Sequence, residues 1–168
     1  MPISPPCPLS DTHDVSDFFC GEDCLDEWLR KRALQNERNK ASRTYVVCDD
    51  NRVIGYYALA VGSIAREYAS SSVRRNMPEP IPAMFLGRLA VDTRYSGRGI
   101  GTAMLRDALM RTVKASEIAG IRVLMVHALS EAAAAFYRGR GFVTSPFDAK
   151  ILMLNLSHVR NAAETVRP

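Results

Sequence analysis

Apolar residues recur at near-helical spacing close to the start of the chain. Leu25, Trp28, Leu29 and Leu34 fall on one face of a segment from about residue 24 to residue 39. Acidic residues lead this segment and basic residues trail it, which suits the dipole of a helix. The pattern predicts one helix with an apolar face inward and a basic face outward.

Two runs of β-forming residues follow, at residues 44–48 and 53–59. The turn residues Asp49, Asp50 and Asn51 join them, so the pattern predicts an antiparallel hairpin. Residues 63–82 lose this periodicity and hold three prolines. They predict a loop with one short helix, extended over residues 78–82.

The rest of the chain alternates apolar strands with helices. The strand at 83–91 is almost continuously apolar, as expected for a strand covered on both faces. Beyond it the pattern predicts a helix at 102–119 that stops before Gly120, a strand at 121–128, a helix at 130–137 and a strand at 151–156. This order predicts an α/β (α+β) fold in which helices flank one mixed central sheet.

The bulk composition narrows the class of protein. A length of 168 residues, with 47% hydrophobic and 24% charged residues, predicts one globular domain over residues 1–168. The longest apolar stretches fall well short of the ~20 residues of a membrane span. Residues 1–6 lack the pattern of a secretory signal, so we expect a cytoplasmic protein. The four cysteines and three histidines show no zinc-type spacing, so we expect reduced thiols and no metal.

The charge is mildly basic and unevenly placed. A net charge of +4 and a pI near 9.0 permit an anionic partner without proving one. Between residues 30 and 43 there are six basic residues and one acidic residue, Glu37. A second basic group comprises Arg66, Arg74 and Arg75. These groups are candidate phosphate-facing surfaces, although ordinary solvation explains a basic helix face equally well.

The segment from Leu89 to Gly101 lies between a predicted buried strand and a predicted helix. Phosphate binds to closely spaced main-chain N–H groups at a helix N-terminus, provided that side chains do not block its approach. The alternating glycines Gly97, Gly99 and Gly101 remove that obstruction. The spacing fits neither a Walker loop, which needs Lys before Ser or Thr, nor the Rossmann fingerprint.

The run Arg94-Tyr95-Ser96-Gly97-Arg98-Gly99 resembles the phosphate-binding motif of the GNAT superfamily of N-acetyltransferases. The resemblance implies the GNAT fold, with parallel strands that splay apart, and acetyl-CoA as cofactor. It implies that amides from Gly97 to Gly101 hold the coenzyme A diphosphate, while the strand offers main-chain groups to the pantetheine arm. The implied cofactor-binding residues are Leu89, Ala90, Val91, Arg94, Gly97, Arg98, Gly99, Ile100, Gly101 and Thr102. The alternative is a structural glycine turn that binds nothing.

The same resemblance gives a role to Tyr137, in the helix after the second core strand. A tyrosine there acts as general acid and protonates the departing thiolate, because a phenol stays neutral until it donates. The alternative is that Tyr137 is only a core aromatic residue, which is the role that we favour for Phe136. The strand before the glycine turn holds no carboxylate to act as base. Asp92 is nearest but lies at the turn, so we do not assign it as base; His127 is a second candidate, although a lone histidine there is more often hydrogen-bonded structure. The amine must lose a proton before it attacks, and either water as the base or an amine of low pKa is enough for this step.

Over almost its whole length the chain also resembles the GNAT toxins of bacterial toxin–antitoxin pairs, which acetylate the aminoacyl group of charged tRNA and block translation. Matching stretches include Phe19-Cys20-Gly21, Leu25-Asp26-Glu27-Trp28-Leu29, Gly55-Tyr56-Tyr57-Ala58-Leu59 and Leu86-Gly87-Arg88-Leu89-Ala90-Val91-Asp92. The resemblance implies a ribbon-helix-helix antitoxin, a homodimer, and tRNA contacts by Arg30, Lys31, Arg38, Arg74, Arg75 and Arg88.

Several alternatives remain open from the sequence. Arg88 lies in an apolar strand, where it either lines a polar cleft or pairs with a buried carboxylate. A GNAT enzyme that acetylates a small-molecule amine or a protein N-terminus, with no toxin role, has the same glycine motif. A GNAT-shaped acyl-CoA sensor or RNA-binding module, without catalysis, is the third alternative.

Overall fold

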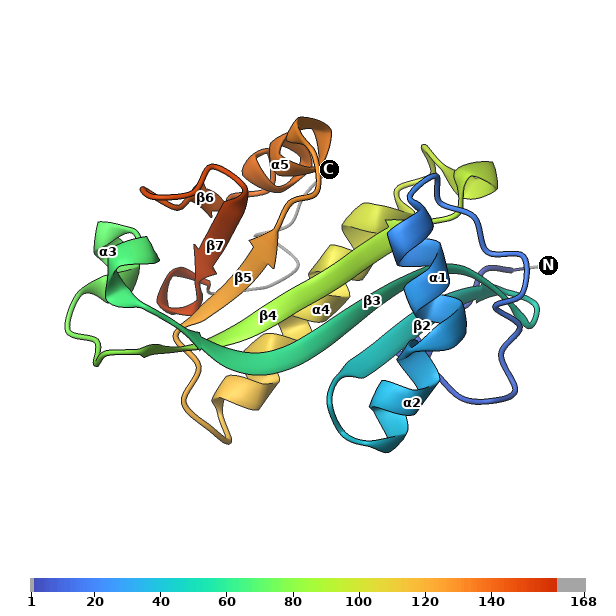
Figure 1. Cartoon of the computed structure of the whole chain (residues 1–168), viewed down its shortest axis with the longest axis horizontal. Coiled ribbons are helices and arrows are strands. Elements are labelled where there is room, and N and C mark those ends of the chain that lie inside the picture. The colour runs from blue at the N-terminus through green and yellow to red at the C-terminus, as the bar shows by residue number, and fades with distance from the viewer. Residues whose placement is uncertain (1, 160–168) are drawn as a thin grey trace. The chain divides into compact units, whose positions relative to one another are not determined.

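The computed structural model describes residues 2–159, and the strands among them form one mixed sheet (Figure 1). The strand order is β1-β2-β3-β4-β5-β7-β6. These residues divide into two compact units, each built from two segments of chain. Unit 1 holds residues 2–60 and 87–105, and unit 2 holds residues 61–86 and 106–159. The mixed sheet and its helices confirm the predicted fold class.

Unit 1 is built on the predicted hairpin. Strands β2 (Arg43–Asp49) and β3 (Arg52–Ile64) pair antiparallel, with Arg43 opposite Leu59. The two-residue strand β1 (Cys7–Pro8), which the sequence pattern did not predict, pairs with β2. Its core comprises Leu9, Phe18, Trp28, Leu29, Ala33, Val46, Cys48, Val53, Tyr56, Ala58 and Ala90.

The single helix predicted over residues 24–39 is wrong, because the chain forms two helices there. Helix α1 (Asp23–Lys31) ends at Arg32, and α2 (Ala33–Arg38) begins immediately after it. Arg32 has φ −123° and ψ −31°, which interrupts the helical path. The bend accompanies the complete burial of Ala33 in the core of unit 1, next to Leu29. The predicted charge order holds, with acidic residues in the first turn of α1 and Arg30 and Lys31 in its last.

Unit 2 begins in the segment that we expected to be a loop. Strand β3 runs on to Ile64, and the 3-10 helix η1 (Arg66–Tyr68) and helix α3 (Ser71–Arg74) follow. The predicted extension over residues 78–82 is interrupted by a bend at Glu79 and Pro80. The Glu79 carboxylate accepts a hydrogen bond from the main chain of Arg66 (3.2 Å), which draws this bend toward η1.

The sheet of unit 2 contains both parallel and antiparallel pairs. Strand β4 (Ile81–Val91) pairs parallel with β5 (Val123–His127) over Ala83 to Leu86. Strand β7 (Ile151–Asn155) pairs antiparallel with β5 and with the short strand β6 (Val143–Thr144). The unit 2 core comprises Ile64, Ala69, Val73, Ile81, Ala83, Val123, Met125 and Met153.

Two helices follow the predicted strands. Helix α4 (Ile100–Ser116) buries an apolar face that comprises Met104, Leu105, Ala108 and Leu109. The helix ends at Ser116, before the end that the sequence predicted at residue 119. The turn that follows is closed by hydrogen bonds between residues three apart, such as that from the amide of Glu117 to the carbonyl of Lys114. Helix α5 (Glu131–Arg138) has Ser130 as its N-cap, and the 3-10 helix η3 (Leu156–His158) follows β7. No helix among residues 2–159 is long and apolar enough to cross a membrane.

Candidate active site

The glycine turn joins β4 to α4 in unit 1. It consists of the 3-10 helix η2 (Thr93–Tyr95), Ser96 and the residues that lead into Ile100. Gly97 and Gly99 both have φ of +78°, in the left-handed region that side chains disfavour. A Cβ built on either glycine meets no atom within 4 Å. The glycines are therefore required by the backbone, and they leave open space above the turn.

This turn has the properties of an anion site. The first N–H groups of an α-helix have no acceptor within the helix, and the helix dipole favours negative charge there. Gly97, Arg98 and Gly99 are exposed, immediately before the start of α4. The guanidinium of Arg98 lies over the Tyr95 ring, 4.9 Å from its centre, so this cation is held against the η2 end of the turn.

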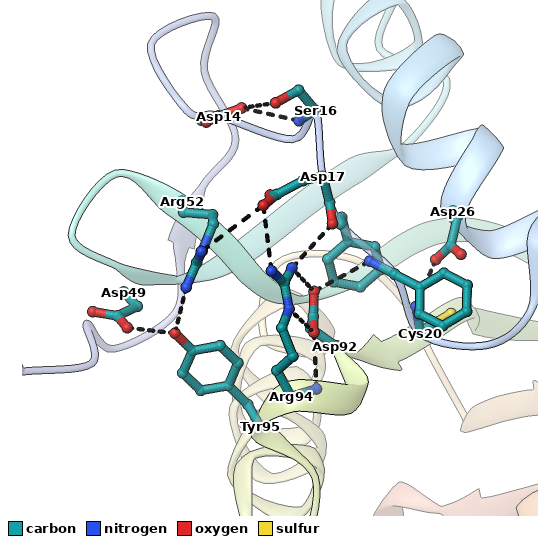
Figure 2. Close-up of polar contacts among 12 residues, drawn as sticks. Asp14, Ser16, Asp17, Cys20, Asp26, Asp49, Arg52, Asp92, Arg94 and Tyr95 are labelled. Carbon is teal, nitrogen blue, oxygen red and sulfur yellow. Dashed lines mark hydrogen bonds and ion pairs between the residues drawn. The ribbon is translucent and has the colours of Figure 1, made fainter.

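Asp92 fixes the start of the turn, as Figure 2 shows. Its carboxylate is fully buried and accepts from the main chain of Arg94 (2.9 Å), the Arg94 guanidinium (2.7 and 2.9 Å) and the amide of Phe19 (3.2 Å). Burial alone would raise the pKa of Asp92, but these hydrogen bonds outweigh it and the pKa is lowered. Asp92 is thus a fixed anion within the turn.

Arg94 completes this arrangement from the outside. Its guanidinium also donates to the main-chain carbonyl of Asp17 (3.0 Å) and forms an ion pair with the Asp17 carboxylate (3.3 Å) (Figure 2). The hydrogen bond to Asp92 is the main cause that raises the Arg94 pKa. The side chain of Arg94 therefore holds the turn in place, and its predicted contact with the cofactor stays a prediction.

Tyr95 anchors the turn to the β2–β3 hairpin. Its hydroxyl donates to Asp49 (2.5 Å) and accepts from the Arg52 guanidinium (2.7 Å), and the residue is buried (Figure 2). Asp49 and Arg52 are the two ends of that hairpin's turn. The glycine turn is therefore fixed at its first residue by Asp92 and at the end of η2 by Tyr95.

The other predicted cofactor residues lie on either side of the turn. The expected cover on both faces of β4 does not extend to its C-terminal part, where Gly87 is exposed and Leu89 and Val91 are only half-buried. Ala90 packs into the core of unit 1. Residues two apart share a face of a strand, so Leu89 and Val91 present the same partly open side. In the first turn of α4, Ile100 and Thr102 are buried and Gly101 is half-buried.

Arg88 lies on the same stretch of β4. Its guanidinium lies over the Trp28 ring of α1, 4.2 Å from the ring centre. A cation–π contact of this kind stabilises a partly desolvated arginine without a carboxylate. The contact fixes Arg88 against the helix that carries Arg30 and Lys31.

The remaining predicted tRNA contacts of unit 1 are the basic residues of α1 and α2. Arg30, Lys31 and Arg38 are all exposed. Arg30 donates to the carbonyl of Phe18 (2.8 Å), so part of its hydrogen-bonding capacity is used within the protein. Lys31 lies 4.0 Å from Glu27, a distance and exposure at which an ion pair contributes little.

In unit 2 the basic residues Arg74 and Arg75 lie at the end of α3, exposed to solvent. Two other arginines hold the carbonyls of this segment. Arg122 donates to the carbonyls of Ser72 (2.9 Å) and Val73 (3.0 Å), and Arg66 donates to that of Arg74 (3.2 Å). Because these carbonyls accept hydrogen bonds from Arg66 and Arg122, the backbone that carries Arg74 and Arg75 is fixed.

Tyr137 lies in α5 of unit 2 and is 7% exposed. Its ring packs against Phe136 and Phe142, with centre-to-centre distances of 5.2 and 5.4 Å. Burial raises the pKa of the Tyr137 phenol above its ordinary value. The hydroxyl is therefore neutral at physiological pH, the state that a proton donor needs.

Sequence reasoning missed the residues that hold the site in place. Asp17 contacts Arg94 through its main-chain carbonyl, Asp26 accepts from the amide of Cys20, and Arg122 donates to a carbonyl 49 residues away. Contacts with main-chain groups leave no spacing in the sequence that identifies these residues. Asp92, which is not assigned as base from the sequence, is one of these residues. Its position two residues before Arg94 is typical of an Asx-type cap, and that signal was present in the sequence.

The comparison with known families agrees with this geometry. The model of the acetyltransferase (GNAT) domain matches residues 40–144, a range that contains β4, the glycine turn, α4 and α5. The chain belongs to the GNAT acetyltransferase family.

Particular relatives are similar over nearly the whole chain. The tRNA-acetylating toxin of Mycobacterium tuberculosis is 49% identical over 157 residues, which cover 94% of this chain and 95% of that protein. The structure of AtaT complexed with acetyl-methionyl-tRNAfMet has a TM-score of 0.86 and 30% identity, and covers 94% of this chain and 97% of that chain. A mutant of the toxin AtaT bound to the C-terminus of the antitoxin AtaR and acetyl-CoA has a TM-score of 0.79 and 29% identity, with 94% and 95% covered.

Proposed function

We propose that this chain is an acetyl-CoA-dependent N-acetyltransferase toxin that acetylates the α-amino group of aminoacyl-tRNA and so blocks translation. One observation carries the proposal: the 49% identity to a tRNA-acetylating toxin over nearly all of both chains. The paired left-handed glycines at the start of α4 supply the cofactor end of the same chemistry.

In this reaction the main-chain amides from Gly97 to Gly101 hold the diphosphate of acetyl-CoA, and Arg98 adds a cation. Leu89 and Val91, on the partly open side of β4, contact the pantetheine arm through their main chain. Each of these groups is fixed before the ligand arrives, because Asp92 and Tyr95 anchor the turn. The cofactor therefore needs little rearrangement of the protein to bind.

The amine of an aminoacyl ester needs little help from a base. An α-amino group has a pKa of about 7.7–8.0, against about 10.4 for lysine, so a usable fraction is neutral at pH 7. The neutral amine attacks the thioester carbonyl, the carbon–sulfur bond breaks, and Tyr137 donates its proton to the departing thiolate. The nitrogen gives up its extra proton to water, and solvent returns a proton to the Tyr137 phenolate. The raised pKa of Tyr137 keeps that proton in place until the thiolate forms.

The acceptor is held by its phosphates. The exposed cations Lys31 and Arg38 in unit 1, and Arg74 and Arg75 in unit 2, are proposed to contact the tRNA backbone together with Arg30 and Arg88. We further propose that the chain acts as a single domain in the cytoplasm, forms a homodimer and is neutralised by a ribbon-helix-helix antitoxin. The complex of AtaT with AtaR supports an antitoxin partner.

Acetyl transfer to charged tRNA tests this function. Purified chain, labelled acetyl-CoA and individually charged tRNAs are incubated, and the acetylated aminoacyl ester is identified by mass spectrometry. The Tyr137→Phe variant should lose activity, while Tyr68→Phe, which removes an exposed hydroxyl from the same unit, should retain it. If tRNA stays unmodified while a small amine or a peptide is acetylated, the result would favour the alternative of a GNAT enzyme without a toxin role.

A further inference from the structure

Residues 17–20, which precede α1, are bonded to two parts of unit 1 at once. On one side they contact α1. The carbonyl of Phe18 accepts from the Arg30 guanidinium (2.8 Å), and the amide of Cys20 donates to the Asp26 carboxylate (2.9 Å). Asp26 and Arg30 lie one turn apart on α1, so the segment is held along the helix.

On the other side the same segment contacts the glycine turn. The amide of Phe19 donates to the Asp92 carboxylate (3.2 Å), and the amide of Thr93 donates to the carbonyl of Phe19 (2.9 Å). Arg94 adds its bond to the carbonyl of Asp17 (3.0 Å). In each of the peptide groups 18–19 and 19–20, one polar group therefore bonds to the helix and the other to the turn.

The two carboxylates at the ends of these contacts are buried. Asp92 is fully buried, and Asp26 is 2% exposed. A buried carboxylate is costly unless it accepts hydrogen bonds, so both are committed to the segment. The thiol of Cys20 stays protonated, because burial and then the neighbouring Asp26 raise its pKa to about 12. Cys20 is thus held in place and is not a reactive thiol.

We propose that residues 17–20 form a tether that sets the position of α1 relative to the glycine turn, and that Asp26 and Asp92 are the positioning residues at its two ends. The proposal rests on the proposed function, since it assigns the turn to acetyl-CoA and α1 to the acceptor. Through Trp28, α1 also holds Arg88. The tether therefore fixes the residues of α1 that are proposed to contact tRNA, and Arg88 with them, relative to the amides that are proposed to hold the diphosphate.

A positioning role predicts a separation between cofactor binding and turnover. Asp26→Ala removes the acceptor for the Cys20 amide and leaves the Asp92 contacts in place. It should lower kcat with charged tRNA by about tenfold or more, since small misplacements of reacting groups are costly. The dissociation constant of coenzyme A should stay within about twofold, because every contact inside the turn is retained. Asp26→Asn keeps an oxygen that accepts from Cys20 and should restore most of kcat.

Asp23→Ala is the matched control, because it removes an exposed carboxylate from the same turn of α1. It should leave kcat within about twofold. Asp92→Ala should weaken coenzyme A binding as well as turnover, because Asp92 holds the turn itself. A parallel loss of cofactor affinity and kcat in Asp26→Ala, or no rescue by Asp26→Asn, would overturn the assignment of Asp26.

Hydrogen exchange on the wild-type chain gives a test that needs no variant to fold. Saturating coenzyme A should slow exchange at the amides of Phe19 and Cys20 as well as in the glycine turn, because binding stabilises the turn and the segment bonded to it against local opening. Slower exchange in the turn with no change in residues 17–20 would overturn the tether alone. No protection anywhere, with no heat of binding, would remove the proposed function and the tether with it.

Discussion

At the scale of single residues, two properties of glycine matter in the turn: its backbone conformation and its lack of a side chain. Gly97 and Gly99 need a positive φ, and the absence of any atom near a built Cβ leaves the ligand room. The motif in the sequence predicted their importance. It did not predict Asp92 as an anchor, because its partner Phe19 lies 73 residues away in the chain.

Gly97→Ala should therefore destabilise the protein by about 1–2 kcal/mol, the cost of a left-handed residue with a side chain. Coenzyme A affinity should fall as well, because the methyl group projects into the open space above the turn. Gly120→Ala is the control. Gly120 is exposed and does not have a positive φ, and a Cβ built on it also meets no atom within 4 Å. Urea denaturation and calorimetry check both, and equal stability of the two variants would contradict the role of φ.

Tyr137→Phe removes the proton donor without changing the packing against Phe142. The acetylation rate should fall by about a hundredfold or more, the range of general acid catalysis. Burial raises the phenol pKa, so the acid form persists as pH rises past its ordinary value of about 10.

The pH–rate profile of the wild type should accordingly rise toward about pH 8, as the α-amino group loses its proton, and show no decline from Tyr137 below about pH 10. The rate is measured in single turnovers with one charged tRNA. A basic decline near neutral pH that disappears in Tyr137→Phe would contradict this assignment.

At the scale of elements, long periodic segments were predictable and short ones were not. The hairpin and helices α4 and α5 follow from periodicity, whereas β1 and β6 have two residues each and too few positions for a pattern. The bend at Arg32 has no glycine or proline to signal it. It depends on how Ala33 packs in the core, which only the folded chain defines.

The outward side of α1 and α2 gives a prediction about the acceptor. Replacing Lys31 and Arg38 together by Glu should raise the KM for charged tRNA and reduce its dependence on salt, because fewer phosphate contacts form. Coenzyme A affinity should be unchanged. Lys114→Glu together with Lys150→Glu is the control, because it reverses two exposed charges outside α1 and α2 and changes the net charge by the same amount. An equal effect of the control pair would show that only net charge matters.

The junction between β4 and η2 gives a prediction about acid stability. The Asp92 pKa is lowered in the folded chain, so its contribution to stability is complete above the unfolded value of about 3.9 and is lost as pH falls through the folded value. Asp92→Asn should be less stable at neutral pH, and the difference should narrow in acid.

Urea denaturation at a series of pH values checks this, with Asp11→Asn, an exposed carboxylate, as control. A stability difference between wild type and Asp92→Asn that stays constant down to about pH 2 would exclude the ionised carboxylate as its source.

At the scale of the whole molecule, the order of strands and the glycine motif together define a GNAT acetyltransferase, and the family match agrees. The fold class was predictable because each long element has its own period. The contacts that hold the site were not, because they join main-chain groups to side chains distant in sequence. The substrate depends on similarity to relatives and on exposed charge, and remains the proposed part of the account.

The central claim is that main-chain amides of the glycine turn bind a diphosphate. It is tested by calorimetric titration of the folded chain with coenzyme A and with pantetheine, which has the same arm but lacks the diphosphate and the 3′-phosphoadenosine. Dephospho-coenzyme A, which keeps the diphosphate, is the control that should still bind. Coenzyme A is expected to bind, and the affinity for pantetheine should be weaker by about a hundredfold or more, since charge-assisted bonds to the turn are lost. Equal affinities, or no heat from coenzyme A, would contradict it.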